Sequence, residues 1–233
     1  GKKSSTMIVG EDGKTTTEKD IVERDDFWAT TSNKQLNFVQ HIKTLLKPHG
    51  RAAVVVPDNV LFEGGAGETI RRKLMHECDV HTLLRLPTGL FYAQGVKANV
   101  LFFDKKPASE TPWTKQLWIY DLRTNRHFTL KTNPLKREDL DEFVRLYHVA
   151  NRHDRQPTWS AKNPDGRWRA YAYDELIARD LGGEPKPALD ERGIALVVGR
   201  AVGVQARHED DPRDAAVEEQ LDVLVLGDAP WRP

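Results

Sequence analysis

Few residues in this sequence combine the types and the spacing that chemistry requires. A glycine-rich turn at residues 64–67 stands before a helical pattern, where backbone N–H groups could approach a phosphate. The turn lacks the Gly-Lys-Ser/Thr ending of a P-loop and the full Gly-x-Gly-x-x-Gly spacing, so a simple flexible turn is the favoured interpretation. His76, Cys78 and His81 come nearest to a metal-ligand cluster, but they lack partners at ligand spacing, and we expect no metal. No Gly-x-Ser-x-Gly elbow is present, so the residues alone predict no complete catalytic set.

Opposite charges balance in this chain, since Lys and Arg total 35 and Asp and Glu also total 35. That balance argues against a generally polybasic binder of nucleic acid or membranes, but it leaves room for a local basic surface. The longest apolar runs, such as 52–57, span about six residues, whereas a membrane helix needs roughly 20, so we expect no membrane span. A single cysteine excludes an internal disulfide and fits a reducing cytosol. The chain begins at Gly1 without an initiating Met, and we expect it to be a piece of a longer protein.

The apolar pattern predicts an open α/β sheet that would position any such site. Short apolar runs predict strands at 52–57, 80–86, 99–103 and 116–122. Apolar residues at helical spacing predict helices between Asn33 and Pro48 and at 68–78, 135–148 and 173–180. The β-branched run at 52–57 is typical of a strand buried in a parallel sheet, whereas the close pair at 80–86 and 99–103 predicts an antiparallel hairpin at one edge. The first 33 residues are predicted to form a loop, and 151–169 shows no clear period.

Three blocks of this sequence resemble one protein family. They are residues 32–57, the block Leu-Pro-Thr-Gly-Leu-Phe and its continuation at 86–103, and the segment 121–131. The sequence resembles the methylation (M) subunit of type I restriction–modification systems, which are adenine-specific DNA N6-methyltransferases. The resemblance covers about residues 1–185, and the Leu-Pro-Thr-Gly-Leu-Phe block is its most specific part.

The resemblance implies a Rossmann-like methyltransferase sheet with an antiparallel edge hairpin, followed by a helical and irregular C-terminal segment. It assigns residues 1–148 to the C-terminal half of the methyltransferase domain and 149–191 to a C-terminal extension. Residues 192–233 depart from the family and are a tail of unclear structure. The implied cofactor is S-adenosyl-L-methionine, bound mostly by an N-terminal part that this chain lacks. The family's Asn-Pro-Pro-Phe motif would lie just before Gly1, so we expect no catalytic residue within the chain.

The resemblance also implies site residues and partners. Phe91 is expected to stack on an adenine flipped out of the duplex, although a core plug beneath the loop is the interpretation that the residues alone favour. Lys2, Lys3 and Lys97 are candidates for contact with the DNA backbone, and solvated lysines are the equal alternative. The implied partners are DNA, a specificity subunit and a restriction subunit, and the implied location is the cytoplasm.

Two other functions compete with this one. The chain could be a non-catalytic docking fragment that supplies a sheet edge and a partner surface. It could also belong to an RNA or protein methyltransferase that shares the same sheet.

Overall fold

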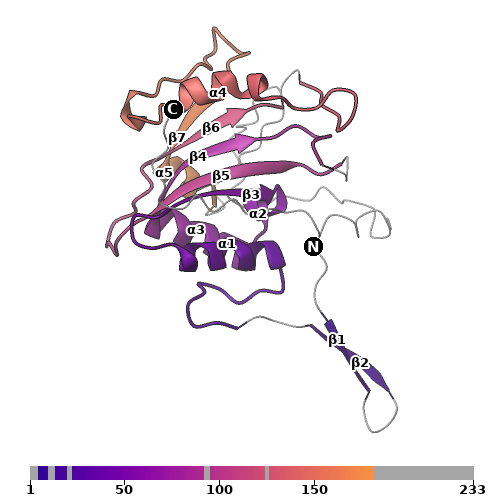
Figure 1. The fold of residues 1–233 in the computed structure, drawn as a ribbon. Coiled ribbons are helices and arrows are strands. Elements are labelled where there is room, and N and C mark those ends of the chain that lie inside the picture. The colour runs from indigo at the N-terminus through magenta and orange to yellow at the C-terminus, as the bar shows by residue number, and fades with distance from the viewer. Residues whose placement is uncertain (1–4, 10–13, 20–22, 92–94, 124–125, 181–233) are drawn as a thin grey trace.

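The computed structural model describes residues 5–9, 14–19, 23–91, 95–123 and 126–180 of the chain. Its main feature is a five-stranded sheet in the order β3-β5-β4-β6-β7 (Figure 1). The strands are β3 (Arg51–Pro57), β4 (Cys78–Arg85), β5 (Ala98–Lys105), β6 (Gln116–Asp121) and β7 (Trp168–Ala172). The helices are α1 (Lys34–Leu45), α2 (Asn59–Phe62), α3 (Ala66–Glu77), α4 (Asp141–Tyr147) and α5 (Tyr173–Asp180), with short 3-10 turns at Arg137–Leu140 and Arg152–Asp154.

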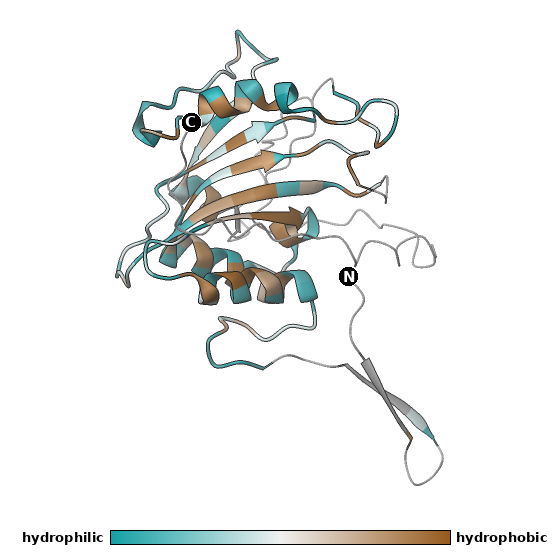
Figure 2. Ribbon diagram, viewed as in Figure 1, coloured by the Kyte–Doolittle hydropathy of each residue, from teal (hydrophilic) through white to brown (hydrophobic). Residues whose placement is uncertain are grey.

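Two apolar cores cover the two faces of this sheet, and Figure 2 shows the apolar residues along the strands between them. On one face, α1, α3 and α5 pack against the strands through residues such as Leu36, Ile70 and Leu176. On the other face, α4 contributes Phe143, and Trp168 of β7 is fully buried and stacks on Trp118 at 5.3 Å between ring centroids. The helices therefore hold the strands from both faces of the sheet.

The predicted helix between Asn33 and Pro48 is confirmed as α1, and its start follows from one side chain. The Oδ1 atom of Asn33 accepts hydrogen bonds from the backbone N–H groups of Gln35 and Leu36, at 3.0 and 3.3 Å. These are two of the donors that the first turn of a helix leaves without a partner. The predicted strands and the helices α3 and α5 are also present, with ends shifted by a few residues.

The position of the predicted hairpin differs from the expectation. Strands β4 and β5 do pair antiparallel, but β3 and β6 flank them, so the hairpin lies inside the described sheet and not at its edge. The run at 52–57 forms β3 at that edge and pairs antiparallel with β5, so its apolar character did not signal a parallel neighbour. Of the strand pairs in this sheet, only β4 and β6 are parallel.

Three further expectations need correction. Part of the predicted N-terminal loop forms a separate antiparallel hairpin of β1 (Ser5–Val9) and β2 (Thr15–Lys19), because backbone pairing does not require apolar residues (Figure 1). The segment without a clear period contains the start of β7. The predicted helix at 135–148 is reduced to a 3-10 turn followed by α4. The tail at 192–233 lies outside the described residues.

No helix within the described ranges has both the length and the apolar character needed to cross a membrane.

Candidate functional site

Polar side chains gather at the edge of the sheet that is formed by the carboxyl ends of β3, β4 and β6, which is distinct from the edge strand β3. Asp58 directly follows β3, Arg85 is the last residue of β4, and Asp121 is the last residue of β6. Asn99, near the start of the antiparallel β5, lies opposite Arg85, so it belongs to the same edge. Ligand sites of open α/β sheets lie outside the carboxyl ends of the strands, and this edge is therefore the candidate site.

Arg123, just after β6, connects these side chains through its guanidinium group. Its Nη2 atom donates to Oδ1 of Asp58 at 2.6 Å and to Oδ1 of Asn99 at 3.0 Å. Its Nε atom donates to the backbone carbonyl of Leu86 at 3.1 Å. Nδ2 of Asn99 completes the set by donating to Oδ1 of Asp58 at 2.7 Å. One guanidinium thus joins the ends of three strands in a single hydrogen-bonded cluster.

Arg85 adds a second positive charge beside this cluster. Its Nη1 atom lies 3.7 Å from Oδ2 of Asp121, whose Oδ1 accepts a hydrogen bond from the backbone N–H of Arg123 at 2.8 Å. Burial and the neighbouring Arg123 charge lower the pKa of Arg85, although Asp121 and Asp58 oppose that shift. Because Arg85 and Arg123 are opposed by Asp121 and Asp58, the charges at this edge nearly cancel. The edge is therefore not a general binding site for anions.

The loop at 86–97, which joins β4 to β5, carries the predicted stacking residue. Its turn contains Gly89 with φ of +89°, and a Cβ atom there would lie 2.1 Å from the carbonyl oxygen of Phe128. Only glycine fits that close approach, so the loop is pressed against the chain that follows β6. Leu90 and Phe91 come next, and both are half-buried against the core on the α4 face.

Of the three lysines predicted to contact the DNA backbone, only Lys97 lies within the described residues. Lys97 has an exposed side chain, and its backbone carbonyl accepts a hydrogen bond from the N–H of Asp58 at 3.0 Å. Lys97 and Phe91 lie on the same connection between β4 and β5. Lys2 and Lys3 lie outside the described residues.

Comparison with known proteins identifies the family. The model of the family described as N-6 DNA methylase matches residues 10–177. The chain belongs to this family. The EcoKI methylase subunit of a type I restriction enzyme of Escherichia coli (strain K12) is 51% identical over 152 residues, which are 64% of this chain and 28% of that subunit.

Solved structures agree with this assignment and with a Rossmann-like sheet. The crystal structure of the type I restriction enzyme EcoKI M protein matches with a TM-score of 0.56 and 45% identity, over 65% of this chain and 36% of that one. A chain from a study of complex assembly in a type I restriction–modification system matches with a TM-score of 0.54 and 29% identity, over 68% of this chain and 33% of that one. The chain thus spans 28% of the EcoKI subunit and 33–36% of the two matched chains in solved structures.

The glycine-rich turn at 64–67 does not fit the nucleotide-binding role that methylases need for their cofactor. Such a turn joins a strand to a helix, whereas this one joins α2 to α3. Arg71 also holds the segment just before this turn, because its Nη1 atom donates to the carbonyl oxygens of Glu63 at 2.7 Å and Val60 at 3.2 Å. The interpretation as a simple turn is supported.

The three residues nearest to a metal-ligand pattern do not come together. Among the described residues, no three His, Cys, Asp or Glu side chains gather as metal ligands would. Cys78 is a buried free thiol, and burial raises its pKa to about 12. Nε2 of His76 lies 3.3 Å from the carbonyl oxygen of Glu110, while Nδ1 of His81 lies 2.8 Å from Oγ1 of Thr82.

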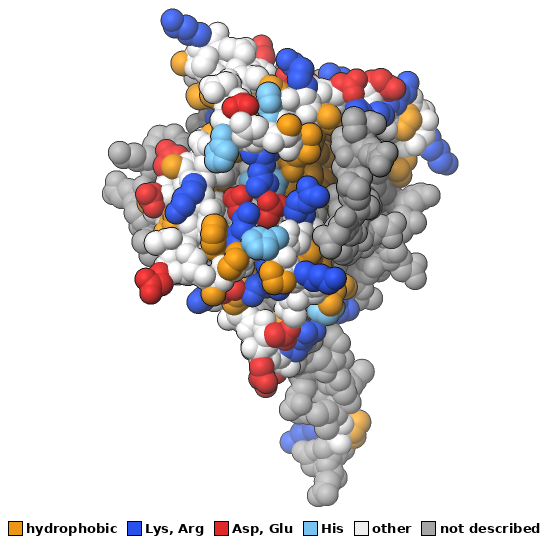
Figure 3. All heavy atoms as spheres, turned by 60° about the vertical axis from the view of Figure 1, so that its left-hand side comes forward, with side chains coloured by type: hydrophobic (Ala, Val, Ile, Leu, Met, Phe, Trp, Pro, Cys, Tyr) orange, Lys and Arg blue, Asp and Glu red, His pale blue; other side chains and the backbone are white. Residues whose placement is uncertain are grey.

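A second charged cluster lies at the opposite end of the sheet, where Figure 3 shows acidic side chains between basic ones. Nη2 of Arg152 contacts Oδ2 of Asp79 at 3.0 Å and Oδ2 of Asp104 at 2.8 Å, and Nε2 of His81 lies 3.5 Å from Oδ1 of Asp104. Burial opposes ionisation of Asp104, but the nearby His81 ring and the hydrogen bond from Arg152 outweigh it and hold the pKa of that carboxyl well below its usual range. This cluster is an internally paired network at the end away from the loop at 86–97.

The sequence-based prediction missed the cluster of Asp58, Asn99 and Arg123. A signal for it was present, because Asp58 and Arg123 follow apolar runs and Asn99 begins one. Polar residues at the ends of predicted strands point to the edge where sites form. What the sequence did not provide was the strand order that brings these ends together.

Proposed function

We propose that this chain is part of an adenine-specific DNA methyltransferase, which transfers the methyl group of S-adenosyl-L-methionine to N6 of adenine within a type I restriction–modification system. The observation that carries the proposal is the family match over residues 10–177. The 51% identity to a type I methylase subunit narrows it to this class of system. The partners we propose are DNA, a specificity subunit that reads the bases and a restriction subunit, all in the cytoplasm.

The proposed reaction asks for positioning more than for covalent help. The exocyclic nitrogen of adenine attacks an activated methyl group, so the enzyme must hold the amine in line and polarise it. The family's Asn-Pro-Pro-Phe motif serves that purpose, and it does not occur in this sequence. We therefore expect the polarising group to come from a part of the methylase outside this chain. The same part would hold most of the cofactor, since the described glycine turn does not fit one.

Within this chain, we propose that Phe91 replaces the stacking that a flipped adenine loses. Support comes from its position on a loop at the carboxyl ends of the strands, where it is half-buried with part of its surface still open. Lys97 is exposed on the same loop and would meet a backbone phosphate, as would Lys2 and Lys3. These four residues would bind and orient DNA, and none of them would transfer the methyl group.

A methyl-transfer assay on the complete methylase tests this proposal. The full-length subunit containing this chain is purified with its specificity subunit and incubated with host genomic DNA from a methylase deletion strain and methyl-labelled S-adenosyl-L-methionine. We expect label in N6-methyladenine after enzymatic digestion and mass spectrometry. The matched control is DNA from the parent host strain, which still carries the methylase gene. This DNA is already methylated and should take up little label. Label in cytosine, RNA or protein instead of adenine would overturn the proposal.

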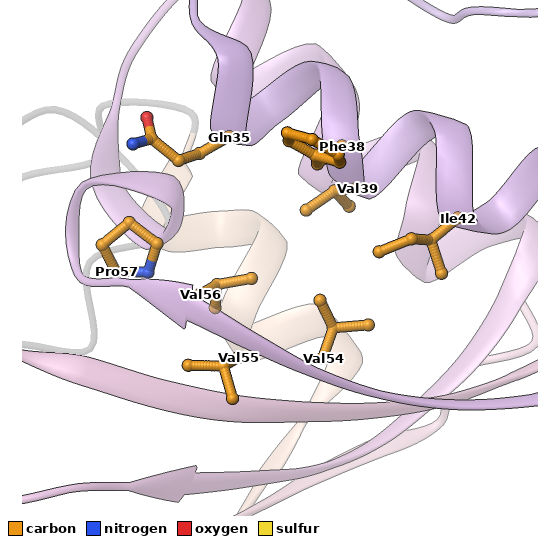
Figure 4. Close-up of a pocket in the computed structure, with 8 residues that line it drawn as sticks. All are labelled: Gln35, Phe38, Val39, Ile42, Val54, Val55, Val56 and Pro57. Atoms are coloured by element: carbon orange, nitrogen blue, oxygen red, sulfur yellow. The ribbon is translucent and has the colours of Figure 1, made fainter. Parts of the chain in front are cut away.

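A groove beside the open edge of the sheet favours a second candidate function, the docking fragment. The groove lies between α1 and β3, and Figure 4 shows its lining, which consists of Gln35, Phe38, Val39, Ile42, Val54, Val55, Val56 and Pro57. Phe38 is 56% exposed there, and β3 pairs within the described sheet on one side only. A regular apolar edge strand of this kind is a template for further pairing. The occupant we propose is the remainder of the methylase sheet, because the chain spans 28% of its type I relative.

Co-purification measures this docking role. The chain is co-expressed with the complementary part of its methylase, and Phe38→Asp should lower the amount recovered in the complex. Leu45→Asp is the matched control, because Leu45 is 63% exposed on the same helix but does not line the groove. Equal recovery of both variants and the parent chain would exclude the groove as the docking surface.

A further inference from the structure

We infer that Arg123, with Asp58 and Asn99, is a positioning cluster that fixes both ends of the loop at 86–97 and thereby sets the place of Phe91. The inference rests on the proposed function, in which Phe91 stacks on the target adenine. Arg123 itself does not contact the base. It affects the reaction by holding the loop that carries Phe91.

The first end of the loop is held directly by the guanidinium group. Nε of Arg123 donates to the carbonyl oxygen of Leu86, the first residue after β4, at 3.1 Å. The backbone supports the same point, because the N–H of Leu122 donates to the carbonyl oxygen of Arg85 at 3.1 Å and the N–H of Leu86 donates to that of Ala98 at 3.0 Å. Where β4 ends, the chain is therefore tied both to the segment after β6 and to β5.

The other end of the loop is held through Asp58 and Asn99. The backbone N–H of Asp58 donates to the carbonyl oxygen of Lys97, the last residue of the loop, at 3.0 Å. Its carboxylate accepts from Arg123 at 2.6 Å and from the side-chain amide of Asn99 at 2.7 Å. Asn99 is fully buried at the start of β5, and its carbonyl oxygen accepts from Arg123 at 3.0 Å. Arg123 thus holds one end of the loop directly and the other end through Asp58.

The chemistry of arginine explains why this residue type stands at the centre. Its planar guanidinium presents five donors in a fixed fork, and here the fork serves Leu86, Asp58 and Asn99 at once. Lysine, with a flexible stem and a point charge, cannot hold three acceptors in fixed directions. The Arg123 and Asp58 side chains remain about one-fifth exposed, at 20% and 21%. Because most of each side chain is buried, removal of one partner should cost stability as well as geometry, and the melting temperature in the test below separates these two effects.

The neighbouring arginine does not take over this function. Nε and Nη1 of Arg85 are buried and have no hydrogen-bond partner among the described residues. Arg85 lies 3.7 Å from Asp121 and contributes charge to the edge, and its Nε and Nη1 atoms donate to none of the described residues of the loop. Arg123 is consequently the side chain that orients the loop.

The test uses Arg123→Gln in the complete methylase assembled with its specificity subunit. Three quantities are measured: the single-turnover methylation rate, the melting temperature, and the fluorescence of 2-aminopurine placed at the target adenine of a duplex carrying the recognition site. Asp58→Asn is the second variant, because it keeps the size of the side chain and places an NH2 group among donors. Arg152→Gln is the matched control, since it removes an arginine that also joins two aspartates, at the opposite end of β4 and β5.

We expect Arg123→Gln and Asp58→Asn to lower the methylation rate by about tenfold to a hundredfold, since displacement of a positioning group by about 1 Å has costs of that size. The fluorescence should change with the rate, because 2-aminopurine reports stacking. Arg152→Gln should lower the melting temperature by at least as much and leave rate and fluorescence near those of the parent enzyme. A parent-like rate and fluorescence in Arg123→Gln would overturn the inference, as would equal losses in Arg152→Gln. If the parent enzyme itself methylates no adenine, the proposed function fails instead.

Discussion

Replacing Phe91 by alanine separates the two roles that its position allows. The side chain is half-buried against the core on the α4 face, so it contributes to packing. It also stands on a loop at the carboxyl ends of the strands, which is where a flipped base would arrive. In the complete methylase, we expect Phe91→Ala to slow methylation strongly and to lower the melting temperature only a little.

The expected size of each effect follows from the degree of burial. Loss of one aromatic stacking face costs about 1–3 kcal/mol per base, which slows the reaction by roughly 5- to 150-fold. Emptying a fully buried phenylalanine site costs about 3–5 kcal/mol of stability. Phe91 keeps part of its surface exposed, so its packing contribution should fall below that range. A rate loss without a matching stability loss therefore indicates stacking.

Two further substitutions at this position make the assay decisive. Phe91→Leu keeps an apolar side chain but removes the ring, so it should retain stability and lose rate. Phe91→Tyr keeps the ring and should methylate at nearly the parent rate. Leu90→Ala is the matched control, because Leu90 is the preceding residue and is half-buried against the same core.

Rates come from single-turnover transfer of labelled methyl groups, and stabilities come from thermal melts of the same preparations. A large fall in melting temperature for Phe91→Ala, with near-normal turnover in the protein that remains folded, would make Phe91 a core residue. A parent-like rate in Phe91→Leu would have the same meaning, since that variant has no aromatic face.

Three other predictions concern the chain itself. Isothermal titration of the isolated chain with S-adenosyl-L-methionine should give no binding in the micromolar range, because its glycine turn joins two helices, and a micromolar Kd would refute this. The Cys78 thiol, with a pKa raised to about 12 by burial, should react with a thiol reagent only after denaturation, and rapid reaction of the native chain would contradict that. Burial also lowers the pKa of His81, although Asp104 opposes this shift. At pH values between the folded and the unfolded pKa, the unfolded chain therefore binds a proton at His81 that the folded chain does not bind. The free energy of unfolding should therefore fall as the pH drops below about 6.5, by at most about 1.4 kcal/mol per pH unit, and a His81→Gln variant with the same slope would rule this out.

The sequence predicted the elements whose apolar pattern is continuous. Strands β3 to β6 and helix α1 follow from runs such as 52–57 and from a capping asparagine, since burial of those residues depends little on the rest of the chain. Strand β7 was missed because Trp168 stands among polar and charged residues and is buried through contacts with distant residues such as Trp118, Tyr120 and Phe143. The β1–β2 hairpin was missed because β2 is polar throughout, so the short apolar run at the end of β1 has no apolar partner strand in the sequence.

The candidate site was only partly predictable for a different reason. Phe91 and Lys97 lie within one sequence block, so a family resemblance alone could locate them. The residues that hold their loop lie far apart in the chain: Asn99 is 41 positions from Asp58, and Arg123 is 65 positions from it. Only the strand order, with β5 inserted between β3 and β4, brings them together. Pattern along the chain carries no record of that order.

An arginine side chain from another element lies at each end of the β4–β5 pair, Arg152 at one end and Arg123 at the other. The residues paired at each end explain why only Arg123 should affect the reaction. At one end, Asp79 lies directly opposite Asp104, and two like charges in that arrangement destabilise a sheet unless a cation lies between them. Arg152 is that cation, so the fold itself accounts for its presence. At the other end, Arg85 lies opposite the uncharged Asn99, and the strands need no bridging charge there. Arg123 joins the ends of β3, β4 and β5, and these contacts meet at the two ends of the loop that carries Phe91. Its substitution should therefore lower the methylation rate more than Arg152→Gln does.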